Sequence, residues 1–136
     1  MKFEVAVTRQ YPHSIEKVWE GLTSEAAISD WLMHARGFVA EAGCRFEMSC
    51  ANEDGDEDIY RCEVLELDPP KRMRWSWVLG GNEARRSTEV EFRLKSKGDG
   101  TEVTVFHRGD RDKKMLERFR SGWPDKLDQL AETLLR

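Results

Sequence analysis

The sequence predicts an α+β domain: a curved seven-stranded antiparallel sheet around one long C-terminal helix, with two short helices between strands one and two. Two observations predict this fold. Apolar and polar residues alternate in seven segments that turn residues separate, which is typical of antiparallel strands. The C-terminal segment instead repeats its apolar residues at helical spacing. At this length we expect residues 1–136 to form a single domain.

The N-terminal segment is expected to form a strand and then two short helices. Residues 2–10 alternate, which predicts the first strand. Ser14 and Ser24 are suitable N-cap residues, because each precedes a segment with apolar residues at helical spacing. The apolar residues of these two segments are Ile15, Val18, Trp19 and Leu22, then Ala27, Ile28, Trp31 and Leu32.

Six further strands are expected before the last helix. They are a short strand at residues 38–40 and longer ones at residues 44–50, 60–64, 73–79, 88–94 and 103–107. Turns are expected at residues 52–56, 68–71, 80–82 and 98–100. Their regular spacing implies antiparallel pairing, and the alternation gives the sheet one apolar and one charged face.

The C-terminal helix is expected to cover the apolar face of the sheet. Its apolar stripe consists of Leu116, Phe119, Trp123, Leu127, Leu130 and Leu134. Pro124 lies inside this stripe and lacks a backbone donor, so we expect a kink near residues 120–124. The other predicted helices are too short to cover a sheet of this size.

Composition and charge exclude several classes of protein. Charged residues make up 35% of the chain, but five Trp and six Phe favour a compact core over disorder. The net charge of −4 argues against a nucleic-acid partner. The sequence has no run of 18 apolar residues and no visible signal peptide, so we expect no membrane span and a cytoplasmic location. Cys44, Cys50 and Cys62 are then expected to be free thiols.

Metal and cofactor chemistry is not expected. His13, His34 and His107 are scattered along the chain and lack ligand spacing. The acidic segment at residues 54–58 resembles a calcium loop only in charge, because Cys50 and Arg61 occupy positions where that loop needs carboxylates. We therefore predict no metal ligand, no cofactor and no catalytic residue.

Short segments spread over nearly the whole chain match a known pattern. They are PHSIEKVW at residues 12–19, Trp31-Leu32, GCRF at 43–46, EVLELDPPKRM at 63–73, Trp75-Ser76-Trp77, GTEVTVFHRG at 100–109 and Gly122-Trp123. Together they resemble the START-related helix-grip superfamily (SRPBCC) and, within it, the family named after the activator of heat-shock protein 90 ATPase. The resemblance implies a sheet wrapped around the last helix, commonly with a cavity for an apolar ligand between them. It also implies varied activities, since some relatives bind lipids or hormones, some are polyketide cyclases and some assist a chaperone.

Inward-facing aromatic residues are the main candidates for a binding site. Trp75 and Trp77 are two residues apart on one strand and therefore share a face. Two interpretations stay open: these side chains line a cavity for a small apolar or amphipathic ligand, or they fill a solid core. The ligand-binding residues that we predict are Trp31, Phe46, Met48, Trp75, Trp77, Phe92, Val105, His107, Phe119 and Trp123.

Three functions follow from these candidates. The first is non-enzymatic binding of a small apolar or amphipathic molecule, with His107 orienting its polar end; the alternative for His107 is a structural hydrogen bond. The second is a protein-interaction or chaperone-assisting module in stress response, using a protein partner on the outer sheet face. The basic residues of that face are Arg72, Arg74, Arg85, Arg86 and Arg93. The third is a cyclase- or hydrolase-type enzyme in which His107 transfers protons.

Overall fold

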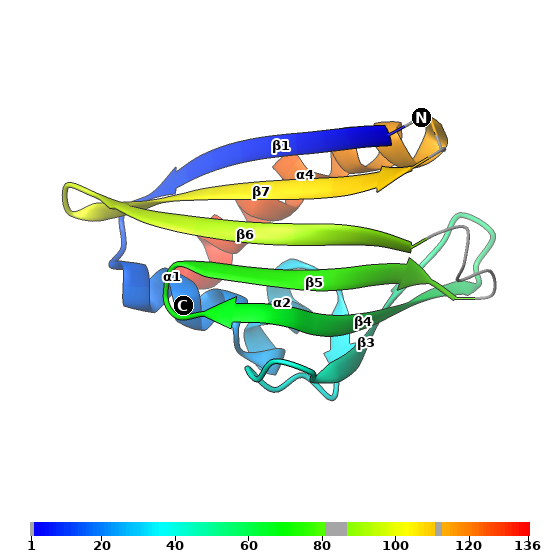
Figure 1. The fold of residues 1–136 in the computed structure, drawn as a ribbon, viewed down its shortest axis with the longest axis horizontal. Helices are drawn as coiled ribbons and strands as arrows, with labels where there is room; N and C mark the ends of the chain where they lie inside the picture. The colour runs from blue at the N-terminus through cyan, green and yellow to red at the C-terminus, as the bar shows by residue number, and fades with distance from the viewer. Residues whose placement is uncertain (1, 81–86, 111–112) are drawn as a thin grey trace.

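The computed structural model describes residues 2–80, 87–110 and 113–136 (Figure 1). In chain order its elements are β1 (Lys2–Tyr11), α1 (Ile15–Leu22), α2 (Glu25–Trp31), β2 (His34–Arg36), β3 (Arg45–Ala51), β4 (Glu57–Asp68), β5 (Arg72–Leu79), β6 (Ser87–Lys97), β7 (Gly100–Asp110) and α4 (Lys113–Leu134). The predicted order of one strand, two short helices, six strands and one long helix is confirmed. The turn expected at residues 80–82 lies largely outside the described residues.

All seven strands belong to one antiparallel sheet in the order β1-β7-β6-β5-β4-β3-β2. From β2 to β7, each strand pairs with the next strand in the chain. The first strand, β1, pairs with β7 and forms one edge of the sheet. Figure 1 shows the sheet in front and α4 crossing behind it, with α1 and α2 at one end. This arrangement covers the apolar face with a single long helix, as predicted.

The strand expected at residues 38–40 is misplaced, because β2 comes earlier, at His34–Arg36. Gly37 takes a positive φ of 84°, which ends the strand. The backbone N–H groups of Gly37 and Phe38 then donate to the carboxylate of Glu25 at 2.6 and 3.0 Å, so they are not available for strand pairing. Phe38 is nevertheless buried, against Phe46.

The helices begin where the sequence predicts. Ser14 Oγ accepts the N–H of Lys17, and Ser24 Oγ accepts the N–H of Ala27, so both serines cap their helices. The α4 helix continues through Pro124, so the kink expected there does not interrupt it. No α-helix among the described residues is both long and apolar enough to cross a bilayer.

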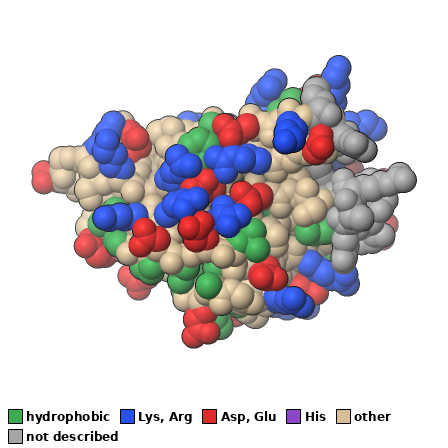
Figure 2. All heavy atoms as spheres, viewed as in Figure 1, with side chains coloured by type: hydrophobic (Ala, Val, Ile, Leu, Met, Phe, Trp, Pro, Cys, Tyr) green, Lys and Arg blue, Asp and Glu red, His purple; other side chains and the backbone are tan. Residues whose placement is uncertain are grey.

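The two faces of the sheet differ as the alternation predicts. The inner face contributes buried side chains such as Met48, Val64, Trp75, Phe92 and Val105 to one core with α4. The outer face is covered by basic and acidic side chains that interleave over the middle of the sheet (Figure 2). Any apolar site must therefore lie on the inner side, between the sheet and the helices.

Candidate functional site

A cavity of about 200 Å³ lies between the end of α2, the inner face of β3, β4 and β5, and α4. Its lining consists of Leu32, Met33, Cys50, Tyr60, Trp77, Arg118, Phe119, Gly122, Trp123 and Lys126. Arg118 is exposed, while Met33, Cys50, Gly122 and Lys126 are half-buried. These five residues form what we call the mouth of the cavity, and the remaining residues form its walls.

Aromatic rings from three elements make up most of the wall. Phe119 and Trp123 are four residues apart on α4 and so lie on one helix face. The centroid of the Trp77 ring on β5 is 6.1 Å from that of Phe119 and 5.8 Å from that of Trp123. Tyr60 on β4 contacts the other side of Trp77, with centroids 5.3 Å apart. The cavity is therefore a pocket for an apolar, preferably flat, molecular body.

Trp77, a wall of the cavity, also carries a polar group without a partner. The side chain is 4% exposed, and its buried Nε1–H has no hydrogen-bond partner among the described residues. Trp75 Nε1 is in the same state, but Trp75 is enclosed by Phe38, Phe46 and Phe92 and does not line the cavity. A buried N–H without an acceptor costs about 1–3 kcal/mol.

His107 lies behind this wall in a continuous chain of hydrogen bonds. Its Nδ1 accepts from Trp123 Nε1–H at 2.9 Å, so the ring proton is assigned to Nε2, which donates to Thr88 Oγ1 at 2.8 Å. Thr88 Oγ1 in turn donates to the carbonyl oxygen of Trp77 at 2.9 Å. Both ring nitrogens are thus engaged within the core, and the ring stacks on Phe119 with centroids 3.6 Å apart.

The protonation state of His107 follows from its burial. Removal from water lowers its pKa from 6.5 to about 3, so the ring is neutral at physiological pH. A neutral imidazole with both nitrogens occupied holds Trp123 in place. It has no free nitrogen with which to take a substrate proton.

The structure divides the ten predicted site residues into two groups. Trp77, Phe119 and Trp123 line the cavity. The other seven are buried and do not line it: Trp31, Phe46, Met48, Trp75, Phe92, Val105 and His107. Ring contacts such as those of Trp31 with Phe92 and with Trp123, at 6.3 and 6.4 Å, fill this deeper region. The aromatic face therefore borders a cavity in one part and fills a solid core in the other.

Sequence reasoning missed most of the mouth. Arg118, Gly122 and Lys126 follow one another at spacings of four on α4, directly beside the apolar pair Phe119 and Trp123. This row was visible in the sequence as a second helical stripe. Tyr60 was also detectable, since it alternates in phase with Cys62 on the predicted strand.

Charged groups of both signs lie near the mouth. Burial raises the pKa of Cys50, and the nearby carboxylate of Asp58 raises it further, whereas Lys126 and Arg118 lower it. Burial also raises the pKa of Tyr60, although the positive charge of nearby Arg118 favours the phenolate. Both groups stay protonated near neutral pH. Lys126 and Arg118 are therefore the cationic groups of the cavity lining.

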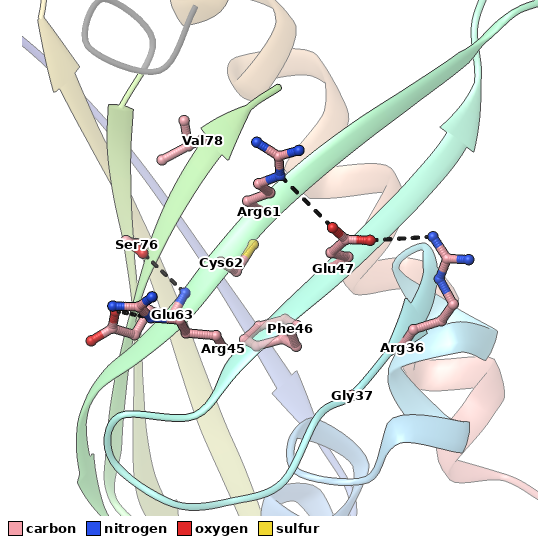
Figure 3. Close-up of a pocket in the computed structure, with 10 residues that line it drawn as sticks. All are labelled: Arg36, Gly37, Arg45, Phe46, Glu47, Arg61, Cys62, Glu63, Ser76 and Val78. Atoms are coloured by element: carbon pink, nitrogen blue, oxygen red, sulfur yellow. Dashed lines mark hydrogen bonds and ion pairs between the residues drawn. The ribbon is translucent and has the colours of Figure 1, made fainter. Parts of the chain in front are cut away.

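A larger depression of about 530 Å³ lies on the outer face of β3, β4 and β5 (Figure 3). Glu47 lies between Arg36 and Arg61, at N–O distances of 3.3 and 3.8 Å, and Arg45 pairs with Glu63 at 3.3 Å. These charges satisfy one another and stay largely exposed, so the depression is a solvated charged surface. We place the candidate site in the smaller inner cavity instead.

The rest of the outer face is also neutralised internally. Glu91 is only 1% exposed and binds Arg72, Arg93 and Arg108 at 2.5, 2.7 and 2.8 Å. Arg74 pairs with Glu66 and with Glu89. Three of the arginines that sequence analysis assigned to a protein partner, Arg72, Arg74 and Arg93, are thus held by carboxylates of the same sheet. Arg85 and Arg86 lie outside the described residues.

Within the described ranges, no three His, Cys, Asp or Glu side chains are arranged to hold a metal ion. Cys44, Cys50 and Cys62 are free thiols. The cavity must therefore be understood from its aromatic walls and its charged mouth.

Comparisons with known proteins agree with this architecture. The family model described as activator of Hsp90 ATPase homolog 1-like protein matches residues 12–135. Among solved structures, protein MLL2253 from Mesorhizobium loti is 30% identical, with 98% of each chain covered and a TM-score of 0.87. CalU16 from Micromonospora echinospora is 27% identical, with 96% of this chain and 75% of that chain covered and a TM-score of 0.78. A search of the curated proteins gives no match.

A third structure shows the fold alone. Protein CV1439 from Chromobacterium violaceum is 20% identical, with 98% of this chain and 97% of that chain covered and a TM-score of 0.86. Sheet, short helices and long helix thus recur together at low identity.

Proposed function

The chain belongs to the family of activator of Hsp90 ATPase homolog 1-like proteins, and on that premise we propose that it binds a small amphipathic molecule without transforming it. The binding site is the cavity between β3–β5, α2 and α4. The observation that carries the proposal is the aromatic wall of this cavity, where the Trp77 ring lies 6.1 Å from Phe119 and 5.8 Å from Trp123 beneath an accessible mouth.

Hydrophobic burial alone gives only modest affinity in a cavity of this size. An aromatic body that buries about 150–250 Å² gains about 4–6 kcal/mol at 25 cal/mol per Å². This corresponds to a dissociation constant from about 1 mM to tens of micromolar. Tighter binding requires polar contacts, and Arg118 and Lys126 in the cavity lining are available for them.

The chemistry of His107 supports binding over catalysis. Its neutral ring is committed to Trp123 and Thr88, and it does not line the cavity. Proton transfer to a bound molecule would first require these hydrogen bonds to break. We therefore assign His107 to positioning the cavity wall.

Gly122 allows the proposal to be tested without damaging the fold. A Cβ added at Gly122 meets no atom within 4 Å, and the residue lines the cavity. Gly122→Leu should therefore occupy the cavity mouth. It should also keep or raise the melting temperature, because Gly costs a helix about 0.8–1.0 kcal/mol relative to the best helix formers.

Isothermal titration with 2-naphthalenemethanol, a neutral amphipathic probe, measures the effect. The wild type should bind the probe, and Gly122→Leu should lose most or all of that affinity. The affinity of Gly122→Ala should lie between the two. Ser121→Leu adds the same side chain at an exposed neighbouring position and should bind like the wild type. A wild type that binds no probe, or a Gly122→Leu variant that binds equally well, would contradict the proposal.

A further inference from the structure

We infer that the ligand carries a carboxylate head group, so that the cavity accepts a small aromatic carboxylic acid; this inference rests on the proposed binding function. The walls alone fit many apolar molecules. The charge of the mouth and the cavity volume together favour one chemical class.

Two cations flank the opening along α4. Arg118 and Lys126 lie four residues before and four residues after Gly122, on one side of the helix and about 12 Å apart along its axis. Gly122 has no side chain, so the cavity is accessible between them. Their long side chains can converge on one anionic group there.

These two cations are available to a ligand in a way that the outer arginines are not. On the outer face, Arg72, Arg93 and Arg108 each lie within ion-pair distance of Glu91. Among the described residues, no carboxylate forms an ion pair with Arg118 or Lys126. Arg118 instead lies close enough to Tyr60 for its charge to lower the pKa of that phenol.

Two acidic groups lie near the mouth on β4. Glu57 and Asp58 act on the Cys50 thiol, and Asp58 already accepts a hydrogen bond from Asn52 Nδ2 at 3.2 Å. Arg118, Gly122 and Lys126 belong to α4 and also line the cavity. A ligand anion is therefore favoured on the α4 side of the mouth.

The charges of the cavity lining favour an anionic head group, because Arg118 and Lys126 both line the cavity. An ammonium head group would face two like charges. A neutral carbonyl or hydroxyl would gain little from Arg118 and Lys126.

The volume limits the body of the ligand. A cavity of about 150 Å³ holds benzene, so about 200 Å³ suits one or two rings. Such rings can contact Tyr60, Trp77 and Trp123 in tilted or edge-to-face geometry. A long alkyl chain would not fit within this space.

A pair of probes that differ only in the head group tests the inference. The wild type should bind 2-naphthoate about tenfold more tightly than 2-naphthalenemethanol at neutral pH, as measured by isothermal titration. Raising the NaCl concentration from about 0.05 to 0.5 M should reduce this preference, because salt screens charges at an exposed mouth.

Variants that remove one charge show which residues cause the preference for the acid over the alcohol. Arg118→Gln and Lys126→Gln should each lower the affinity for 2-naphthoate about three- to tenfold and lower that for the alcohol by a clearly smaller factor. Arg120→Gln removes the same charge from the same helix, at an exposed residue that does not line the cavity, and should have no such effect.

The possible outcomes separate the two proposals. Equal binding of acid and alcohol would overturn the carboxylate inference and leave the binding function standing. Binding of neither probe would overturn both. A preference for the acid that survives in both Gln variants would overturn the assignment to Arg118 and Lys126.

Discussion

Trp123 Nε1–H donates a 2.9 Å hydrogen bond to His107 Nδ1, and this bond joins the long helix α4 to the strand β7 inside the core. Trp123 is a wall of the cavity, whereas His107 lies behind it. The orientation of the wall thus depends on a polar contact that the ligand does not touch.

Removal of this donor should destabilise the domain. Trp123→Phe keeps an aromatic ring but leaves His107 Nδ1 buried without a partner, so the free energy of unfolding should fall by about 1–3 kcal/mol. Urea unfolding followed by circular dichroism measures the change. Trp19→Phe, at a half-buried position, is the control and should cost less. Equal losses in the two variants would show that the hydrogen bond contributes nothing specific.

Acidification should destabilise the protein through His107. Burial lowers its folded-state pKa from 6.5 to about 3, so below about pH 6.5 the unfolded chain binds a proton that the folded chain rejects. The free energy of unfolding should fall by up to about 1.4 kcal/mol per pH unit as the pH decreases from about 6.5 to 5. Urea titrations across this range should show that slope in the wild type and in His13→Asn, and its absence in His107→Asn.

Glu91 should contribute a second, more acidic transition. Burial opposes its charge, but hydrogen bonds from Arg93, Arg108 and Arg72 dominate and lower its pKa from 4.5 to about 2. Its stabilisation is therefore complete above about pH 4.5 and is lost as the pH falls from there towards about 2.

The variant Glu91→Gln isolates this contribution. It leaves three arginines without their shared carboxylate and should cost about 2–3 kcal/mol at neutral pH, less than for a fully buried ion pair because the arginines reach solvent. Glu47→Gln, on the exposed outer depression, should change stability by less than about 1 kcal/mol. Thermal unfolding of both variants provides the comparison, and similar melting temperatures would contradict this role for Glu91.

Two glycines should respond oppositely to the same substitution. A Cβ at Gly109 would lie 2.6 Å from Phe3 Cζ and 2.8 Å from Thr88 Cγ2, so Gly109→Ala should destabilise by about 1–3 kcal/mol. Gly122→Ala meets open space in a helix and should stabilise by up to about 1 kcal/mol. Differential scanning calorimetry should show shifts of opposite sign; shifts of the same sign would refute the assignment.

Periodicity was enough to predict the architecture. Both periodic patterns depend only on which face is buried: the alternation in segments such as Thr88–Leu94, and the apolar stripe from Leu116 to Leu134. Burial is what the sequence encodes most directly. The exception is β2. Its boundary depends on the Glu25 carboxylate accepting two backbone N–H groups, a contact between distant residues that no local pattern contains.

The site was predicted less completely because facing inward does not distinguish a cavity wall from a filled core. Trp75 and Trp77 are equivalent by alternation, yet Trp75 is enclosed by other rings and Trp77 borders open space. That difference depends on how side chains of separate elements fill a volume. Arg118 and Lys126 were overlooked for another reason, since they lie beside the apolar stripe and not within it.

The pairing of β1 with β7 also affects how the chain must fold during its synthesis. Tyr11 pairs with Thr101 and Lys2 with Asp110, so the first strand finds its only described neighbour in the sheet about 90 or more residues later. At about 5–20 residues per second, a ribosome makes β7 roughly 5–20 s after β1. The first strand therefore leaves the ribosome before its partner strand has been synthesised. The first strand can join the sheet only after nearly the whole chain has been translated. Long-range pairing of this kind slows folding.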